Sequence, residues 1–138
     1  MPHRSILRQL SDRGFRRTKI RENLVKIFAG SRAPLSVPGL LASHKELTKV
    51  NKTTLYREVD FLTRQNILTV VTLGDGKARY ELVDQTHHHH LVCEDCGRIS
   101  DVELTEDLES EERRIKKEYA FTVRRHSLEF FGQCSDCH

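Results

Sequence analysis

Apolar residues recur at intervals of three and four along the first third of the chain, which is the spacing of helices with one buried face. The first such stretch covers residues 5–13, and Gly14 suits its C-terminal end. Thr18 is a suitable N-cap for a second helix that ends near Gly30, and Ser36 is suitable for a third. The pattern therefore predicts three short helices before residue 50.

A fourth helix is predicted over Val50–Asn66. Its buried stripe falls at positions i, i+4 and i+7 and consists of Leu55, Val59 and Leu62. Its first two turns expose polar side chains that suit nucleic acid, namely Thr54, Tyr56 and Arg57. The first residues of a recognition helix meet base edges and phosphates, which arginine and hydroxyl groups can bind. An ordinary amphipathic helix would show the same pattern.

The pattern then changes to that of a β-hairpin. Ile67–Leu73 is rich in β-branched residues, Gly74–Gly76 forms a tight turn, and Lys77–Leu82 is a second extended stretch. Helices followed by a basic hairpin are typical of a winged helix. Lys77 and Arg79, near the tip of the wing, are then expected to flank DNA.

A polar linker over residues 83–86 separates this winged-helix domain, residues 1–82, from a second domain over residues 87–138. The second domain begins with a histidine-rich extended run and continues with a strand, a helix and another strand. These three elements are Arg98–Glu103, Thr105–Ala120 and Phe121–Phe131. The predicted fold class is α+β, with a winged helix-turn-helix followed by a small unit built on an antiparallel sheet.

Charge divides the chain at nearly the same place. Residues 1–80 carry 16 lysines and arginines against 6 acidic residues, a net charge of +10, whereas residues 81–138 carry 7 against 14, a net charge of −7. A basic half suits the phosphates of nucleic acid, although two solvated faces of unequal charge would give the same sum. No apolar run approaches the ~20 residues of a membrane span, and no secretory signal begins the chain, so a cytoplasmic protein is expected.

All four cysteines fall in two C-x-x-C pairs, Cys93 with Cys96 and Cys134 with Cys137, separated by 37 residues. Two such pairs that converge on one ion form a tetrahedral four-thiolate zinc site. A redox dithiol or two disulfides are the alternatives, which a cytosolic chain disfavours. Because the second domain is small and poor in large apolar groups, a structural Zn(II) ion and a partner subunit are expected to stabilise it.

Four consecutive histidines, His87–His90, precede the first C-x-x-C pair. On an extended strand, alternate side chains point to opposite faces, so His88 and His90 share one face and His87 and His89 share the other. Each face offers an i, i+2 pair that can chelate an ion together with carboxylates or another histidine. One run can therefore contribute to two separate metal sites, unless it is an exposed polar strand.

TTLYR, the hairpin, HHHHLVCEDCG and the final CSDC together resemble the ferric uptake regulator family over nearly the whole chain. The resemblance implies a metal-responsive bacterial repressor, which is not an enzyme. It implies a homodimer with a C-terminal α/β dimerisation domain, closed by metal onto palindromic double-stranded DNA operators. Members respond to iron, zinc, manganese or peroxide, so regulatory Fe(II), Zn(II) or Mn(II) is expected beside the structural Zn(II).

The resemblance also implies ligand sets. The four cysteines match the structural zinc ligands, and Tyr56 and Arg57 match the signature of the recognition helix. The residues that match the regulatory site are Glu81, His88, His90 and Asp101. The residues that match a second site are His87, His89, Glu109 and His126.

One position departs from the family pattern. Pro34 stands where the family usually has a histidine that joins the regulatory site from the DNA-binding domain. The departure keeps open a second function, a zinc-stabilised DNA-binding dimer that does not sense metal. A metalloenzyme is the third alternative, but the chain has no H-E-x-x-H motif, and closely strung histidines do not define one open catalytic position.

Overall fold

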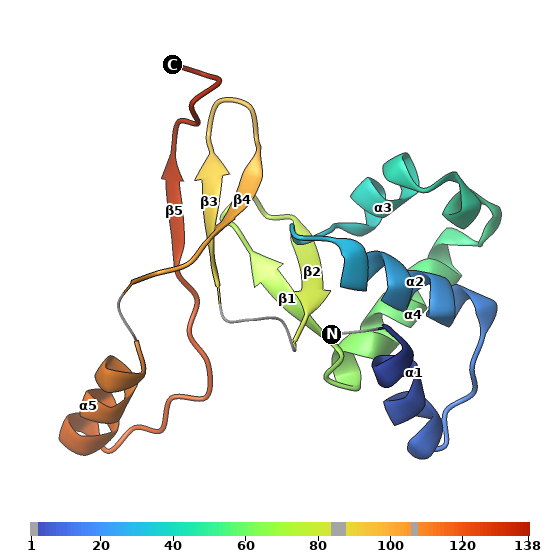
Figure 1. The fold of residues 1–138 in the computed structure, drawn as a ribbon, viewed down its shortest axis with the longest axis horizontal. Helices are drawn as coiled ribbons and strands as arrows, with labels where there is room; N and C mark the ends of the chain where they lie inside the picture. Colours follow the sequence, from blue (N-terminus) through green and yellow to red (C-terminus); the bar gives the residue numbers. More distant parts are fainter. Residues whose placement is uncertain (1–2, 84–87, 106–107) are drawn as a thin grey trace. The chain divides into compact units, whose positions relative to one another are not determined.

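A computed structural model describes residues 3–83, 88–105 and 108–138, which form two compact units, Met1–Thr86 and His87–His138. The described residues of the first unit form four α-helices, a short 3-10 helix and a hairpin (Figure 1). In chain order these are α1 (His3–Asp12), α2 (Lys19–Gly30), α3 (Val37–Ser43), η1 (Lys45–Lys49), α4 (Lys52–Arg64), β1 (Leu68–Thr72) and β2 (Ala78–Leu82).

Side-chain caps fix where the helices of the first unit begin. The hydroxyl of Thr18 accepts a hydrogen bond from the Arg21 N–H at 3.2 Å, and that of Ser36 accepts one from the Gly39 N–H at 3.0 Å. Both N-caps were predicted. The fourth helix begins two residues later than predicted, because Asn51 caps it by accepting from the Thr53 N–H at 2.8 Å.

The core of the first unit joins the helices to the hairpin, with α2 packed against α1, α4 and β2. The stripe predicted on α4 is buried: Leu55, Val59 and Leu62 are each at most 1% exposed. In the hairpin, β1 and β2 pair antiparallel, and Gly74 and Gly76 in the turn adopt positive φ values of 80° and 74°. A side chain with a Cβ rarely adopts such angles, which explains the two glycines.

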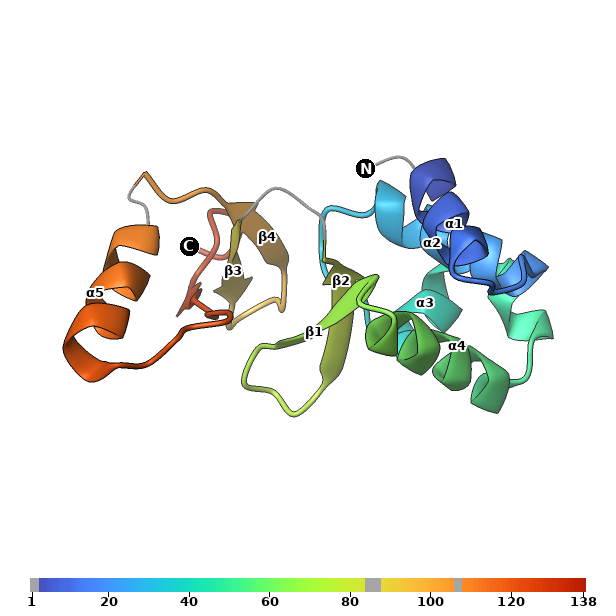
Figure 2. The same cartoon turned by 90° about the horizontal axis from the view of Figure 1, so that it is seen from below.

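The described residues of the second unit form a three-stranded sheet and one helix. Its elements are β3 (His89–Cys93), β4 (Ile99–Val102), α5 (Glu109–Tyr119) and β5 (Glu129–Gly132). The sheet order is β4-β3-β5. Both views show α5 standing apart from the strands (Figures 1 and 2), and none of its residues is buried. The α+β fold class is confirmed.

The sheet of the second unit differs from the prediction in two ways. Residues 121–128 were predicted to be extended within a long third strand, but β5 begins only at Glu129. The sheet was also predicted to be antiparallel; β4 does pair antiparallel with β3, but β5 pairs parallel with it. The cysteine pairs give the physical reason, since each follows its strand, and only parallel strands bring both pairs to the same end of the sheet.

Candidate metal centre and nucleic-acid interface

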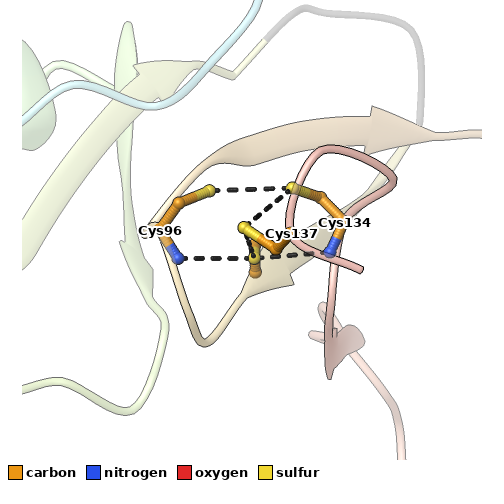
Figure 3. A group of neighbouring side chains, drawn as sticks. Cys96, Cys134 and Cys137 are labelled. Carbon is orange, nitrogen blue, oxygen red and sulfur yellow. Dashed lines mark hydrogen bonds between the residues drawn. The ribbon is translucent and has the colours of Figure 1, made fainter.

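The four cysteines converge at the end of β3 and β5. The Sγ–Sγ distances are 3.8 Å between Cys93 and Cys137, 3.7 Å between Cys96 and Cys134, and 3.5 Å between Cys134 and Cys137. Figure 3 shows the sulfur atoms of Cys96, Cys134 and Cys137 turned toward one another. Zn–S bonds of about 2.3 Å in a tetrahedron place sulfur atoms about 3.8 Å apart. The arrangement therefore fits one zinc ion.

Backbone N–H groups stabilise a thiolate in this cluster, the form of cysteine that binds a metal cation. The N–H groups of Cys96 and Cys134 point at Cys93 Sγ at 3.5 and 3.3 Å, and these hydrogen bonds lower the pKa of the Cys93 thiol to about 6. Contact with Cys134, together with burial, raises the pKa of Cys137 to about 12. The cluster thus favours a thiolate at Cys93 and a protonated thiol at Cys137, and zinc binding would displace that proton.

Two polar contacts join the cysteine motifs besides the sulfur atoms. Arg98 forms an ion pair with Asp136, and the Gln133 side chain donates a hydrogen bond to Asp95 at 2.6 Å. Both acidic residues directly precede the second cysteine of their motif. Sequence reasoning missed these contacts, although the repeated C-x-D-C pattern was a visible signal.

The histidine strand separates its side chains between two faces. His88 and His90 lie together, with ring centroids 5.0 Å apart, and His88 Nε2 is 3.9 Å from a carboxylate oxygen of Asp101. Asp101 also stands opposite His90 in the pairing of β3 with β4. Three residues of the predicted regulatory set therefore lie together within the second unit. The fourth, Glu81, lies on β2 of the first unit, where it pairs with Thr69.

The other face brings His89 to His126. Their rings are stacked with centroids 5.4 Å apart and an interplanar angle of 29°. His126 Nδ1 is 2.6 Å from Glu112, a residue that sequence reasoning missed. Glu112 lies one helical turn after the predicted Glu109 on α5, so the i, i+3 spacing was the available signal. His87, the remaining member of the predicted set, lies outside the described residues.

Burial argues against an exposed polar strand, because His89 and His90 are only 4% and 5% exposed. Buried imidazoles need partners for their ring nitrogens. Glu109, whose carboxylate is 3.9 Å from the Arg113 guanidinium, stands at the start of α5. The two faces of the strand thus carry separate groups of imidazoles and carboxylates, a donor set that suits Fe(II), Mn(II) or Zn(II).

The residues predicted to meet DNA lie on the first unit. Thr54, Tyr56 and Arg57 are exposed in the first two turns of α4, opposite its buried stripe, and Lys77 is exposed at the wing. Arg79 differs, because both terminal guanidinium nitrogens bond to the Asp75 carboxylate, at 3.1 and 2.7 Å, and its side chain is 15% exposed. This pairing lowers the pKa of Asp75 to about 2. In this structure Arg79 therefore stabilises the turn of the wing through its pairing with Asp75.

Within the described parts of the chain, no helix has both the length and the apolar composition needed to cross a membrane.

Comparison with known proteins agrees with this arrangement. Residues 12–131 match the model of the Ferric uptake regulator family. The ferric uptake regulation protein of Bacillus subtilis is 33% identical over 138 residues, covering 96% of this chain and 91% of its own length. That of Campylobacter jejuni is 31% identical over 137 residues, covering 97% and 85%.

Solved structures of the same kind share the fold. The ferric uptake regulator of Helicobacter pylori, described as having three functional metal binding sites, is 26% identical with a TM-score of 0.79, covering 99% of this chain and 94% of its own. These relatives are transcription regulators, which confirms that an enzyme is the wrong class for this chain. The chain belongs to the ferric uptake regulator family of metal-responsive, DNA-binding regulators.

Proposed function

We propose that this chain is a metal-dependent repressor that binds palindromic operators as a homodimer and controls metal homeostasis or a peroxide response. The observation that carries the proposal is the histidine strand, whose two faces hold separate imidazole and carboxylate groups beside a four-cysteine cluster. A purely structural metal protein would need only the cysteines.

The four cysteines would hold a structural Zn(II), whose bonds tie the end of β3 to the segment after β5. Asp95 and Asp136 support that closure through their contacts with Gln133 and Arg98. The backbone N–H groups of Cys96 and Cys134 stabilise the thiolate of Cys93. The proposed domains are residues 1–82 and residues 87–138, joined by a linker at residues 83–86. All four cysteines lie in the second of them, the dimerisation domain, so the zinc would belong to it.

A regulatory Fe(II), Zn(II) or Mn(II) ion would use the other donors. His88, His90 and Asp101, with Glu81, form one proposed set. His89 and His126, with His87 and Glu109, form the second. Such an ion supplies positive charge that draws separate carboxylates and imidazoles together. It can favour the DNA-binding state only by binding that state more tightly.

The exposed apolar side chains of the second unit favour binding of a partner subunit. Among its described residues, those that are buried are Cys93, His89 and His90, so it lacks an apolar core of its own. Large apolar side chains stay exposed instead, including Tyr119 at 69% and Phe121 at 62%. A unit of this size needs additional burial to be stable. A second copy of the chain would provide it and would give a dimer suited to a palindrome.

DNA binding by the first unit, in the cytoplasm, is proposed to use Thr54, Tyr56 and Arg57 of α4 with Lys77 of the wing. Arg79 of the wing would join them on leaving Asp75, which holds its guanidinium in this structure. Pro34 favours a second candidate, a zinc-stabilised dimer that binds DNA without sensing metal, because the family's bridging histidine is missing there. Operator binding, titrated with Fe(II), Mn(II) and Zn(II) on protein that keeps its structural zinc, separates the two. A repressor of the proposed kind tightens on at least one metal, whereas equal affinity with and without every metal would leave the second candidate.

A further inference from the structure

The guanidinium of Arg21, on α2, is held by three different groups of the first unit. Its Nε and Nη2 donate to the two carboxylate oxygens of Glu58 on α4, at 3.1 and 2.9 Å. Its Nη1 donates to the backbone carbonyl of Arg16 at 2.7 Å, and its Cζ lies 4.1 Å from the centre of the Phe61 ring. Phe15 meets the same ring edge-on at 4.9 Å. One side chain therefore connects α2, α4 and the segment between α1 and α2.

This ion pair is mostly removed from water. The Arg21 and Glu58 side chains are 12% and 15% exposed, whereas Arg64 and Asp60, an ion pair further along α4, are 69% and 66% exposed. An exposed pair contributes little to stability. A buried charge must keep its partner in good geometry, because an unpaired one is costly. The Arg21–Glu58 pair therefore constrains the position of α4 in a way that the exposed pair cannot.

The constraint is directional, unlike the apolar packing around it. Burial of Leu55, Val59 and Leu62 favours any rotation of α4 that keeps the stripe covered, because the hydrophobic effect has no preferred direction. A planar fork that bonds both oxygens of one carboxylate fixes distance and orientation together. Glu58 directly follows Arg57, so fixing the one carboxylate also fixes the direction in which the exposed Arg57 projects.

We infer that Arg21 and Glu58 are positioning residues for DNA recognition, which set the orientation of α4 relative to the segment that carries the exposed Arg16 and Arg17. This inference rests on the proposed DNA-binding function. Glu58 is an acidic residue on α4, the helix that is proposed to face DNA, which is a polyanion. Charge alone would make Glu58 unfavourable there, because it repels phosphates. Pairing with Arg21 offsets the negative charge of Glu58 and fixes the orientation of its carboxylate relative to α2.

The chain offers a matched test. Glu58→Gln and Asp60→Asn each remove one negative charge from α4, two residues apart, and each replaces a carboxylate paired with an arginine. If charge alone matters, both variants bind DNA more tightly, and by similar amounts. If Glu58 positions the helix, Glu58→Gln loses specific affinity while Asp60→Asn does not. Arg21→Lys, which keeps the charge but loses the fork, then behaves like Glu58→Gln.

The measurement is affinity for two duplexes by fluorescence anisotropy, using zinc-containing dimer with added Mn(II). One duplex is enriched from a random pool by the wild-type protein, and the other is a scrambled duplex of the same composition. We expect Glu58→Gln and Arg21→Lys to lose about tenfold in the ratio of specific to scrambled affinity. The ratio is insensitive to a fraction of unfolded protein, because unfolding lowers both affinities alike.

The failures are distinguishable. Wild-type protein that enriches no duplex overturns the proposed function, and the inference with it. Wild-type protein that discriminates between the duplexes, while Glu58→Gln discriminates equally well or matches Asp60→Asn, overturns the inference alone. Asp60→Asn with an unchanged ratio beside a reduced one for Glu58→Gln and Arg21→Lys supports it.

Discussion

Replacing Cys137 by serine tests whether zinc holds the second unit together. Cys137 Sγ is 3.8 Å from Cys93 and 3.5 Å from Cys134, so it contacts both cysteine pairs. A serine hydroxyl is a poor zinc ligand, because zinc in such sites binds thiolates. The substitution should leave three sulfur ligands and weaken zinc binding by orders of magnitude.

The magnitude follows from what else the second unit has. Zinc contributes about 10–16 kcal/mol to small structural domains, whereas a whole domain is usually stable by about 5–15 kcal/mol. No large apolar side chain among the described residues of the second unit is buried, and those of Tyr119 and Phe121 are mostly exposed. Loss of zinc should therefore exceed any stability that the unit has without it. We expect the unit to unfold and the dimer to dissociate.

The assay combines zinc content by elemental analysis, mass by sedimentation, and thermal unfolding followed by circular dichroism. Ser135→Ala is the matched control, because it alters an exposed residue between two ligands without removing one. We expect the control to keep about one zinc per chain, the number that a single four-thiolate site holds. Cys137→Ser protein that retains the wild-type melting temperature and dimeric mass without zinc would show that zinc does not hold the second unit together.

Four further predictions concern single side chains. Arg57→Ala should weaken operator binding by about 1–3 kcal/mol in an anisotropy titration, and an unchanged affinity would remove α4 from the interface. Asp75→Asn should release Arg79, which can then reach a phosphate. The slope of log DNA affinity against log salt concentration should become steeper by about 0.9. An unchanged slope would mean that Arg79 does not reach DNA. The Asp75 pKa is lowered to about 2, so the stability from the Asp75–Arg79 pair is fully present above the ordinary pKa of 3.8 and is lost as pH falls toward 2. DNA binding by the wild-type protein between pH 5 and 8 should therefore show no titration of Asp75. Glu112→Gln should weaken Mn(II) binding at the His89 and His126 face in calorimetry, and equal affinity would show that Glu112 does not orient His126.

Much of the first unit was predictable, because local signals and tertiary packing agree there. Thr18 and Ser36 cap helices as expected, and the apolar stripe of α4 is buried. The short periods of 3.6 and 2 residues report which side of an element is covered. They do not report which polar side chains meet across the fold, so the pairing of Arg21 with Glu58 and of Arg79 with Asp75 was missed.

The second unit was harder to predict, since few of its apolar positions carry information about packing. The direction of β5 depends on contacts between two cysteine pairs that are separated by 37 residues, and a strand pattern is the same in either direction. The two-faced histidine strand was predictable from alternation alone. Glu112 was missed because helical spacing places it on the same side of α5 as Glu109 and does not decide which of the two carboxylates meets His126.

Calorimetric titration of the zinc-containing dimer with Mn(II) tests whether the histidine strand serves two separate metal sites. Two sites should give two binding events per chain, the tighter one at the His89 and His126 face, because Pro34 stands where the other set would gain a ligand. His88→Ala and His90→Ala should both remove the weaker event, and His89→Ala and His126→Ala should both remove the tighter one. A single event, or histidine variants that pair as neighbours in sequence instead of as alternates, would mean that the strand does not divide its histidines between two sites.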